Sequence, residues 1–218
     1  MTKIIVIVAT FVAGLALDGH AELPAQMALG LAVWGVLSWI VASAGRDERF
    51  ALMACVVIAT AGELFLSLVW GLYSYRLGNV PLFVPPGHAL LLYLGLCLSR
   101  VLPARAAVAV IGIAGVFSLG LAVTGVDTLG LALFGLLAVT SLALPEQRRL
   151  YASTFLLALA LELYGTAVGS WAWSREITFP GLVTTNPPLA AGAFYAALDA
   201  LTACAALWLS RSSRFART

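Results

Sequence analysis

Charged side chains are scarce in this sequence. Asp, Glu, Lys and Arg make up 10% of its 218 residues, whereas 62% are hydrophobic and the mean hydropathy is +1.02. Soluble domains carry about 25% charged residues, and a chain of this length has too much surface for its volume to hide so many apolar side chains from water. A soluble fold is therefore excluded, and we expect lipid to be the solvent for much of the chain.

Motifs of soluble enzymes are also missing. The sequence has no Ser/His/Asp array, no glycine-rich phosphate loop, no Cys/His metal spacing and no Asp-rich DDxxD motif. These absences argue against hydrolases, nucleotide-driven pumps and Mg²⁺-dependent prenyl transfer, and we expect no metal or other cofactor. The net charge of +2 does not indicate a nucleic-acid partner. Each cysteine lies in an apolar run without a CxxC spacing, which is typical of small core residues: Cys55, Cys97 and Cys204.

Apolar runs bounded by charges, prolines or glycines divide the chain. A helix needs about 20 apolar residues to cross a bilayer, with a range of about 17–25. The runs predict an all-α bundle of eight transmembrane helices: Ile4–Leu17, Pro24–Ala44, Phe50–Tyr75, His88–Leu102, Ala106–Val123, Leu129–Leu144, Leu150–Trp173 and Leu189–Ser210. The first run, between Lys3 and a possible cleavage site at Ala21, also has the make-up of a signal peptide. We interpret it as a retained first span.

The basic residues test this number of spans. If Lys3 is cytoplasmic and every run crosses once, only Arg76 and Arg175 lie on the outer side. The other ten of the 12 Lys and Arg residues face the cytoplasm: Lys3, Arg46, Arg49, Arg100, Arg105, Arg148, Arg149, Arg211, Arg214 and Arg217. Cytoplasmic loops of membrane proteins are enriched in basic residues. We therefore expect both termini inside, in the inner membrane of a bacterial cell.

One motif occurs twice in the chain. It consists of an intramembrane Glu, an aromatic-x-aromatic pair, an Arg, a Pro and a double Pro. The first copy has Glu63, Arg76 and Pro81, and each of these recurs 99 positions later as Glu162, Arg175 and Pro180. Each copy occupies the third span of a four-span half, so the sequence predicts two parallel repeats, residues 1–103 and 104–218, in one membrane domain. Chance similarity between apolar segments is the alternative.

Three carboxylates lie within predicted spans and are candidate catalytic residues: Glu63, Glu162 and Asp199. A carboxylate inside a bilayer is costly unless it is protonated, paired or hydrated, so such residues are functional candidates. A buried carboxylic acid that stays neutral can donate a proton. The alternative is that the two glutamates only form hydrogen bonds between helices and fix the packing.

Other polar and aromatic residues lie near these carboxylates in the sequence. His88 follows a Pro-Pro-Gly turn, where it can relay protons or cap a helix. The aromatic residues form either an interfacial belt or a pocket that faces a cationic intermediate. We predict the following set as substrate-binding: Trp70, Tyr73, Tyr75, Arg76, Tyr164, Trp171, Trp173, Arg175 and Asn186. The proline-rich loops 78–87 and 174–188 are candidate lids over this pocket. Asp18, His20 and Glu22 have a spacing that can bind a metal, but a solvated loop is the preferred interpretation.

The first copy of the motif resembles a known family. An intramembrane Glu, a Gly, a Tyr-x-Tyr pair and two prolines also occur in the membrane carotenoid-biosynthesis proteins that include the hydratases of C50 carotenoids; here these residues are Glu63, Gly71, Tyr73, Tyr75, Pro81 and Pro85. The sequence also looks like lycopene-cyclase-type and small membrane terpene-cyclase proteins. It departs from the hydratases where their Thr-Gly-x-Pro-Phe-Gly is Ser-Leu-Val-Trp-Gly in this chain. The resemblance implies an isoprenoid substrate.

These observations lead to one main hypothesis. We expect an intramembrane enzyme that protonates or deprotonates an alkene of an apolar isoprenoid, with hydration, cyclisation and isomerisation all open. The bilayer itself would deliver the lipid-like substrate. A proton-coupled transporter and a non-catalytic membrane subunit are the alternatives, because parallel repeats with buried acids also occur in carriers.

Overall fold

The protein is mostly helical in the computed structural model, which describes residues 1–215 and the side chains as far as residue 205. Eight α-helices lie within these residues: α1 (Thr2–Asp18), α2 (Leu23–Ala42), α3 (Arg46–Glu63), α4 (Val84–Val101), α5 (Ala104–Val123), α6 (Thr128–Ala143), α7 (Arg148–Ala167) and α8 (Gly192–Phe215). A π-helix, η1 (Leu64–Val69), continues α3, and a 3₁₀ turn, η2 (Pro145–Gln147), precedes α7. The all-helical prediction is thus confirmed for most of the chain.

Five helical segments are long and apolar enough to cross a membrane: Leu23–Ala42, Arg46–Val69, Val84–Val101, Ala104–Val123 and Pro145–Ala167. Shorter apolar helices cover Thr128–Ala143 and Gly192–Ala205. Large apolar side chains cover the outside of the bundle, as in α5, where Val116 is 73% and Val123 is 80% exposed. A surface of this kind is typical of a protein that lipid surrounds. Arg211, Arg214 and Arg217 lie outside the described side chains.

Two predicted spans are too long at their outer ends. The helix predicted to reach Tyr75 ends at Val69, and the helix predicted to reach Trp173 ends at Ala167. The cause is a glycine in the left-handed region shortly after each end, Gly71 with φ +72° and Gly169 with φ +78°, a conformation that glycine adopts without steric cost. Short strands follow, which the sequence analysis did not predict: β1 (Tyr73–Tyr75), β2 (Trp171–Trp173), β3 (Glu176–Ile177) and β4 (Leu182–Val183).

Helices α4 and α8 begin four and three residues away from the positions predicted. The helix predicted to start at His88 starts at Val84, because Pro85 and Pro86 fit its first turn, where no backbone N–H donor is needed. The last helix starts at Gly192 and not at Leu189. The earlier start of α4 places His88 one turn inside the helix, so that its side chain points into the bundle and not into a loop.

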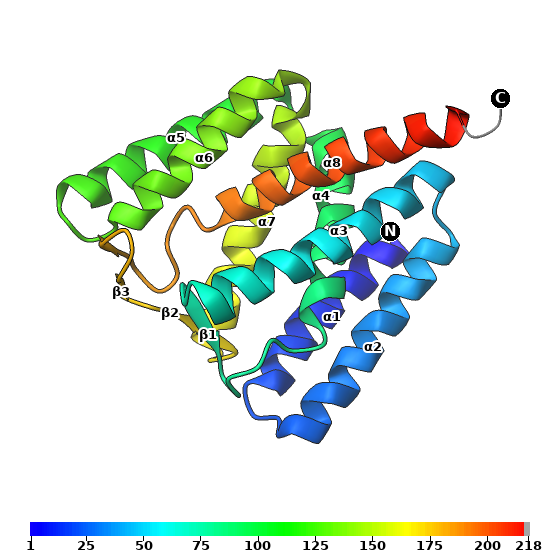
Figure 1. The fold of residues 1–218 in the computed structure, drawn as a ribbon, viewed down its shortest axis with the longest axis horizontal. Helices are drawn as coiled ribbons and strands as arrows, with labels where there is room; N and C mark the ends of the chain where they lie inside the picture. Colours follow the sequence, from blue (N-terminus) through cyan, green and yellow to red (C-terminus); the bar gives the residue numbers. More distant parts are fainter. Residues whose placement is uncertain (216–218) are drawn as a thin grey trace.

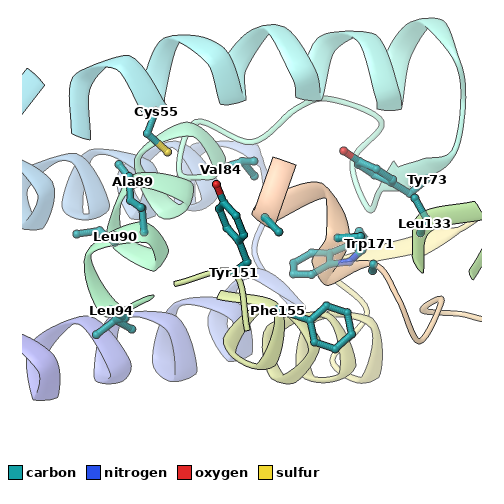
Figure 2. Packing of buried hydrophobic residues seen from close by; sticks show 14 of the residues in the cluster. Cys55, Tyr73, Val84, Ala89, Leu90, Leu94, Leu133, Tyr151, Phe155 and Trp171 are labelled. Atoms are coloured by element: carbon teal, nitrogen blue, oxygen red, sulfur yellow. The ribbon is translucent and has the colours of Figure 1, made fainter. Parts of the chain in front are cut away.

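Four helices form the centre of the bundle. Helices α3 and α7 each pack against both α4 and α8. The α1–α2 hairpin lies on one side of this centre and the α5–α6 hairpin on the other, while the strands gather at one end (Figure 1). Residues from three of the central helices meet in the core, among them Cys55, Leu90, Tyr151 and Phe155 (Figure 2). Cys97 is half-buried and Cys204 is exposed, so the prediction of a core position is wrong for Cys204.

Two buried aspartates hold the loops in place at the end of the bundle where the strands lie. Asp18, at the end of α1, accepts a 2.8 Å hydrogen bond from Gln26, whose amide oxygen accepts one of 2.9 Å from Asn79 in the loop after β1. Asp127, before α6, caps that helix through Gly130 N at 2.7 Å and accepts a 3.2 Å hydrogen bond from Thr185 in the loop after β2. Each helical hairpin therefore holds one of the two proline-rich loops in place.

Close packing between α4 and α7 depends on a glycine. A Cβ atom added at Gly95 would collide with Cγ2 of Thr154, whereas one added at Gly112 in α5 meets no atom within 4 Å. We predict that Gly95→Ala destabilises the protein by about 1–3 kcal/mol through overpacking. Gly112→Ala should be neutral or stabilise by up to about 1 kcal/mol, because alanine favours the helix. Thermal unfolding in detergent, followed by circular dichroism, measures both; equal midpoints would contradict the close contact.

Candidate functional site

Two short strands bring the two copies of the motif together. Strand β1 pairs antiparallel with β2, with Tyr73 opposite Trp173 and Tyr75 opposite Trp171. Alternate side chains of a strand point to the same face, so these four aromatic residues are buried while Ser74 and Ala172, which form the central pair, are exposed. Tyr73 packs on Trp173 with ring centroids 4.8 Å apart. An interfacial aromatic belt is therefore not their role.

The aromatic residues of β1 enclose Glu63. Its Oε2 accepts hydrogen bonds from the hydroxyls of Tyr73 at 2.8 Å and Tyr75 at 2.7 Å. Burial, reinforced by the charge of Glu63, raises the pKa of both tyrosines above the usual value, so both remain protonated donors. The third neighbour is His88 from α4, whose Nε2 lies 3.3 Å from Oε1 of Glu63.

The aromatic residues of β2 enclose Glu162 in the same way. Its Oε2 accepts hydrogen bonds from the indole N–H groups of Trp171 at 2.8 Å and Trp173 at 2.9 Å. The third neighbour again comes from the helix after the strand, because the Tyr195 hydroxyl of α8 lies 3.3 Å from Oε1. The two third neighbours stack on each other, with the His88 and Tyr195 rings 5.0 Å apart and inclined by 11°.

The spacing from each glutamate to its aromatic residues differs by one residue between the copies. Tyr73 follows Glu63 by ten positions, whereas Trp171 follows Glu162 by nine. The π-helix after Glu63 accounts for the difference, because each of its turns holds more residues than an α-helical turn, as the bond from Trp70 N to Phe65 O shows. The two strands can thus present their aromatic residues to the two glutamates at the same depth.

The hydrogen-bond partners fix which oxygen of each glutamate can exchange a proton. An indole N–H only donates, so Oε2 of Glu162 carries no proton, and a proton on this side chain must lie on Oε1. For His88, Nδ1 lies 3.0 Å from the backbone oxygen of Val84, which only accepts, so Nδ1 carries a hydrogen. Nε2 of His88 and Oε1 of Glu63 can therefore share one further proton at this contact.

Both glutamates line one cavity of about 230 Å³. The four strand aromatics, His88 and Tyr195 form its polar and aromatic end, and apolar side chains of α1, α2, α3 and α8 form the rest. Phe83 and Val84 close it from the first proline-rich loop and the start of α4. Leu201, which is 57% exposed, also lines the cavity, so the cavity reaches the apolar surface of α8.

Five residues predicted to bind substrate do not line this cavity. Asn186 supports β2, because its side-chain oxygen accepts a 2.9 Å hydrogen bond from Trp173 N. Trp70 and Tyr164 donate to backbone oxygens of Phe179 and Val12 at 2.7 and 2.9 Å. The exposed guanidinium of Arg76 donates to the backbone of Ala21, and Arg175 is exposed. The hydrogen bonds of Asn186, Trp70, Tyr164 and Arg76 hold the loops and helices around the cavity. Of the residues predicted to bind substrate, only the four aromatics of β1 and β2 line it.

Two other sets of predicted residues lie apart from the glutamates. Asp199 is buried, one turn along α8 from Tyr195, but it does not line the cavity. Asp18 is fully buried and bonded to Gln26, whereas His20 and Glu22 are exposed. The solvated-loop interpretation is therefore wrong for Asp18. Among the described residues, no group of three His, Cys, Asp or Glu side chains could hold a metal ion.

Sequence reasoning missed Tyr195 and Asp127. Tyr195 lies in α8, 33 positions from the glutamate that it contacts, and only the packing of α7 against α8 brings the two together. Asp127 had a local signal, because an Asp directly before an apolar helical run is a common N-cap.

Comparisons with known proteins identify no relative. No family model, curated protein or solved structure matches the sequence.

A hydrogen bond donated to a buried carboxylate should contribute more to stability than one donated to a neutral backbone oxygen. Tyr75→Phe removes a donor to Glu63, which we predict to cost about 1.5–3 kcal/mol. Tyr164→Phe is the matched control, because its hydroxyl donates to the exposed backbone oxygen of Val12 and should cost about 0.5–1.5 kcal/mol. Unfolding by denaturant in detergent micelles measures both values, and a loss in Tyr75→Phe no larger than in the control would contradict the arrangement.

Proposed function

We propose that this protein is an integral membrane enzyme that adds a proton to, or removes one from, an alkene of an isoprenoid lipid. One observation carries the proposal: two buried glutamates, each with one oxygen bonded to two donors from a strand and the other beside His88 or Tyr195, line a single apolar cavity together with four aromatic rings. General acids and bases, aromatic faces and the exclusion of water are the requirements of carbocation chemistry.

The proposal includes the arrangement in the membrane. We infer eight spans with both termini in the cytoplasm of a bacterial cell, and two parallel repeats that meet at β1 and β2. The distribution of basic residues supports the orientation. The matching environments of Glu63 and Glu162, each with two donors from a strand and one neighbour from the next helix, support the repeat.

The pair of Glu63 and His88 is the proton donor in this proposal. A proton carried by Oε1 of Glu63 or by Nε2 of His88, which lie 3.3 Å apart, is transferred to one carbon of the alkene, and the π electrons form the new C–H bond. The neighbouring carbon becomes a cation, and the Glu63–His88 pair is left with one proton fewer. The hydrogen bonds of Tyr73 and Tyr75 to Oε2 stabilise the negative charge that develops on Glu63.

Glu162 acts on the cation. Its Oε1 either holds the cation by its charge or removes a proton from the carbon next to it, which restores a double bond. The faces of Trp171, Trp173, Tyr73 and Tyr75 lie around the same space and favour a cation. Loss of a different proton gives isomerisation, attack by a second double bond gives cyclisation, and capture of water gives hydration.

The cavity favours one end of a long substrate. Its volume of about 230 Å³ lies below the range of about 300–1,000 Å³ that is usual for ligand pockets. The end group of an isoprenoid can lie beside the glutamates while the rest of the chain passes Leu201 into the bilayer. The resemblance of Glu63, Tyr73 and Tyr75 to carotenoid-biosynthesis proteins favours the same substrate class.

Expression in a carotenoid-producing host tests the proposal. We predict a new isoprenoid product in lipid extracts of cells with the wild-type protein, and at least about a 100-fold decrease in Glu63→Gln or Glu162→Gln. When membranes that contain the protein are supplied with unlabelled isoprenoid in D₂O buffer, the product should carry one solvent-derived deuterium on carbon at each protonated alkene. Mass spectrometry separates hydration, which adds water, from cyclisation and isomerisation, which leave the mass unchanged.

Glu146→Gln is the matched control, because Glu146 lies exposed in the turn before α7 and its substitution should leave the product unchanged. Identical extracts from wild type, both variants and the empty vector would contradict the enzyme proposal. Proton-driven flux into liposomes that is lost in Glu63→Gln would then favour the carrier.

A further inference from the structure

A second buried polar cluster lies in the central helices outside the cavity. Asp199 is 4%, Tyr151 0% and Thr202 2% exposed. The Oδ2 atom of Asp199 and the hydroxyl oxygens of Tyr151 and Thr202 have no hydrogen-bond partner among the described residues. A buried polar atom without a partner costs about 1–3 kcal/mol, so three in one place call for a ligand that satisfies them.

The three side chains face one region. Tyr195, Asp199 and Thr202 follow one another at spacings of four and three residues, which places them on one face of α8. Asp199 is close enough to act electrostatically on both Tyr151 of α7 and Cys55 of α3. In Figure 2 the Tyr151 hydroxyl points toward the side of the core that holds Cys55.

The cluster lies between the cavity and the opposite end of the bundle. Tyr151 comes three residues after Arg148, where α7 begins, and Glu162 comes eleven residues later on the same face of the helix. At about 1.5 Å per residue this distance is about 16 Å, and Asp199 lies beside Thr154, which is between these two levels of α7. The end that carries Arg148 and Arg149 is the end that we infer to be cytoplasmic.

We propose that Asp199, Tyr151 and Thr202 bind internal water and form a proton route between the cytoplasmic end and Glu162. Buried water forms about three hydrogen bonds to polar groups that otherwise lack partners, and it commonly bridges groups that are too far apart for direct contact. The carboxyl and two hydroxyls offer both donors and acceptors. A metal would need more charged ligands than this cluster supplies.

The route ends at Glu162 through Tyr195. When Glu162 has taken a proton on Oε1, that proton passes to the Tyr195 oxygen, and the hydroxyl proton of Tyr195 passes to the bound water. The water gives a proton to one oxygen of the neutral Asp199 carboxyl, whose other oxygen releases its own proton toward Tyr151. Each step breaks one O–H bond and forms another, so no electrons are transferred. The route rests on the proposed function, because it resets Glu162 between turnovers, but proton exchange at Asp199 can be measured without any substrate.

Infrared spectroscopy of the purified full-length protein tests the route. We expect the carbonyl stretch of a protonated carboxylic acid that is lost in Asp199→Asn and retained in Glu162→Gln. After transfer to D₂O this band should shift, and the shift should slow about tenfold or more in Tyr151→Phe, which removes a proton-carrying hydroxyl. If Asp199→Asn does not fold, Thr202→Val is a second variant, which removes a hydroxyl but keeps the shape of the side chain.

Ser118→Ala is the control, because Ser118 in α5 is also buried without a described partner but lies outside the cluster. Its exchange rate should equal that of the wild type. A band that survives in Asp199→Asn, or equal exchange rates in wild type, Tyr151→Phe and Thr202→Val, would overturn the route. If hydrogen exchange at Asp199 depends on Tyr151 and Thr202 as expected but the protein yields no isoprenoid product, only the proposed function would be contradicted.

Discussion

The burial of two carboxylates in an apolar bundle is the constraint on which the end of the structure that carries the strands depends. An isolated carboxylate in such surroundings costs several kcal/mol unless donors surround it. Helices cannot supply these donors from their own backbone, whose N–H groups are used within the helix. The donors come instead from β1 and β2, and this requires α3 and α7 to end early. Gly71 and Gly169, both in the left-handed region, allow the chain to turn back toward the glutamates.

Because the two strands pair, the hydrogen-bond donors of each glutamate depend on the strand that carries the donors of the other glutamate. Because β1 and β2 hydrogen-bond to each other, neither set of aromatic residues is placed without its partner strand. The strands in turn are held by loops that Asp18 and Asp127 fasten to the helical hairpins. The exposed arginine Arg76 donates to the turn between α1 and α2. The polar residues of the loops thus position the strands and do not line the cavity.

Much of the bundle was predictable because hydrophobic runs and charges are local signals. Glu63, Glu162 and the aromatic pairs could be identified because a charged residue in an apolar run and a repeated motif are visible in the sequence. The ends of α3 and α7 could not, because a glycine within an apolar run does not reveal the sign of its φ angle. The pairing of β1 with β2 joins residues about 100 positions apart, and three-residue strands carry almost no periodicity. Tyr195 was missed for the same reason, since only helix packing brings it to Glu162.

The two glutamates have similar surroundings but different neighbours, and the difference separates their roles. Glu63 lies beside His88 and accepts hydrogen bonds from two hydroxyls. Glu162 is held by two indole N–H groups that only donate, and its free oxygen meets Tyr195. In the proposed function, a site with two identical neighbours would offer no direction for proton transfer. The histidine beside one glutamate and the tyrosine beside the other would provide the asymmetry that moving a proton along an alkene requires.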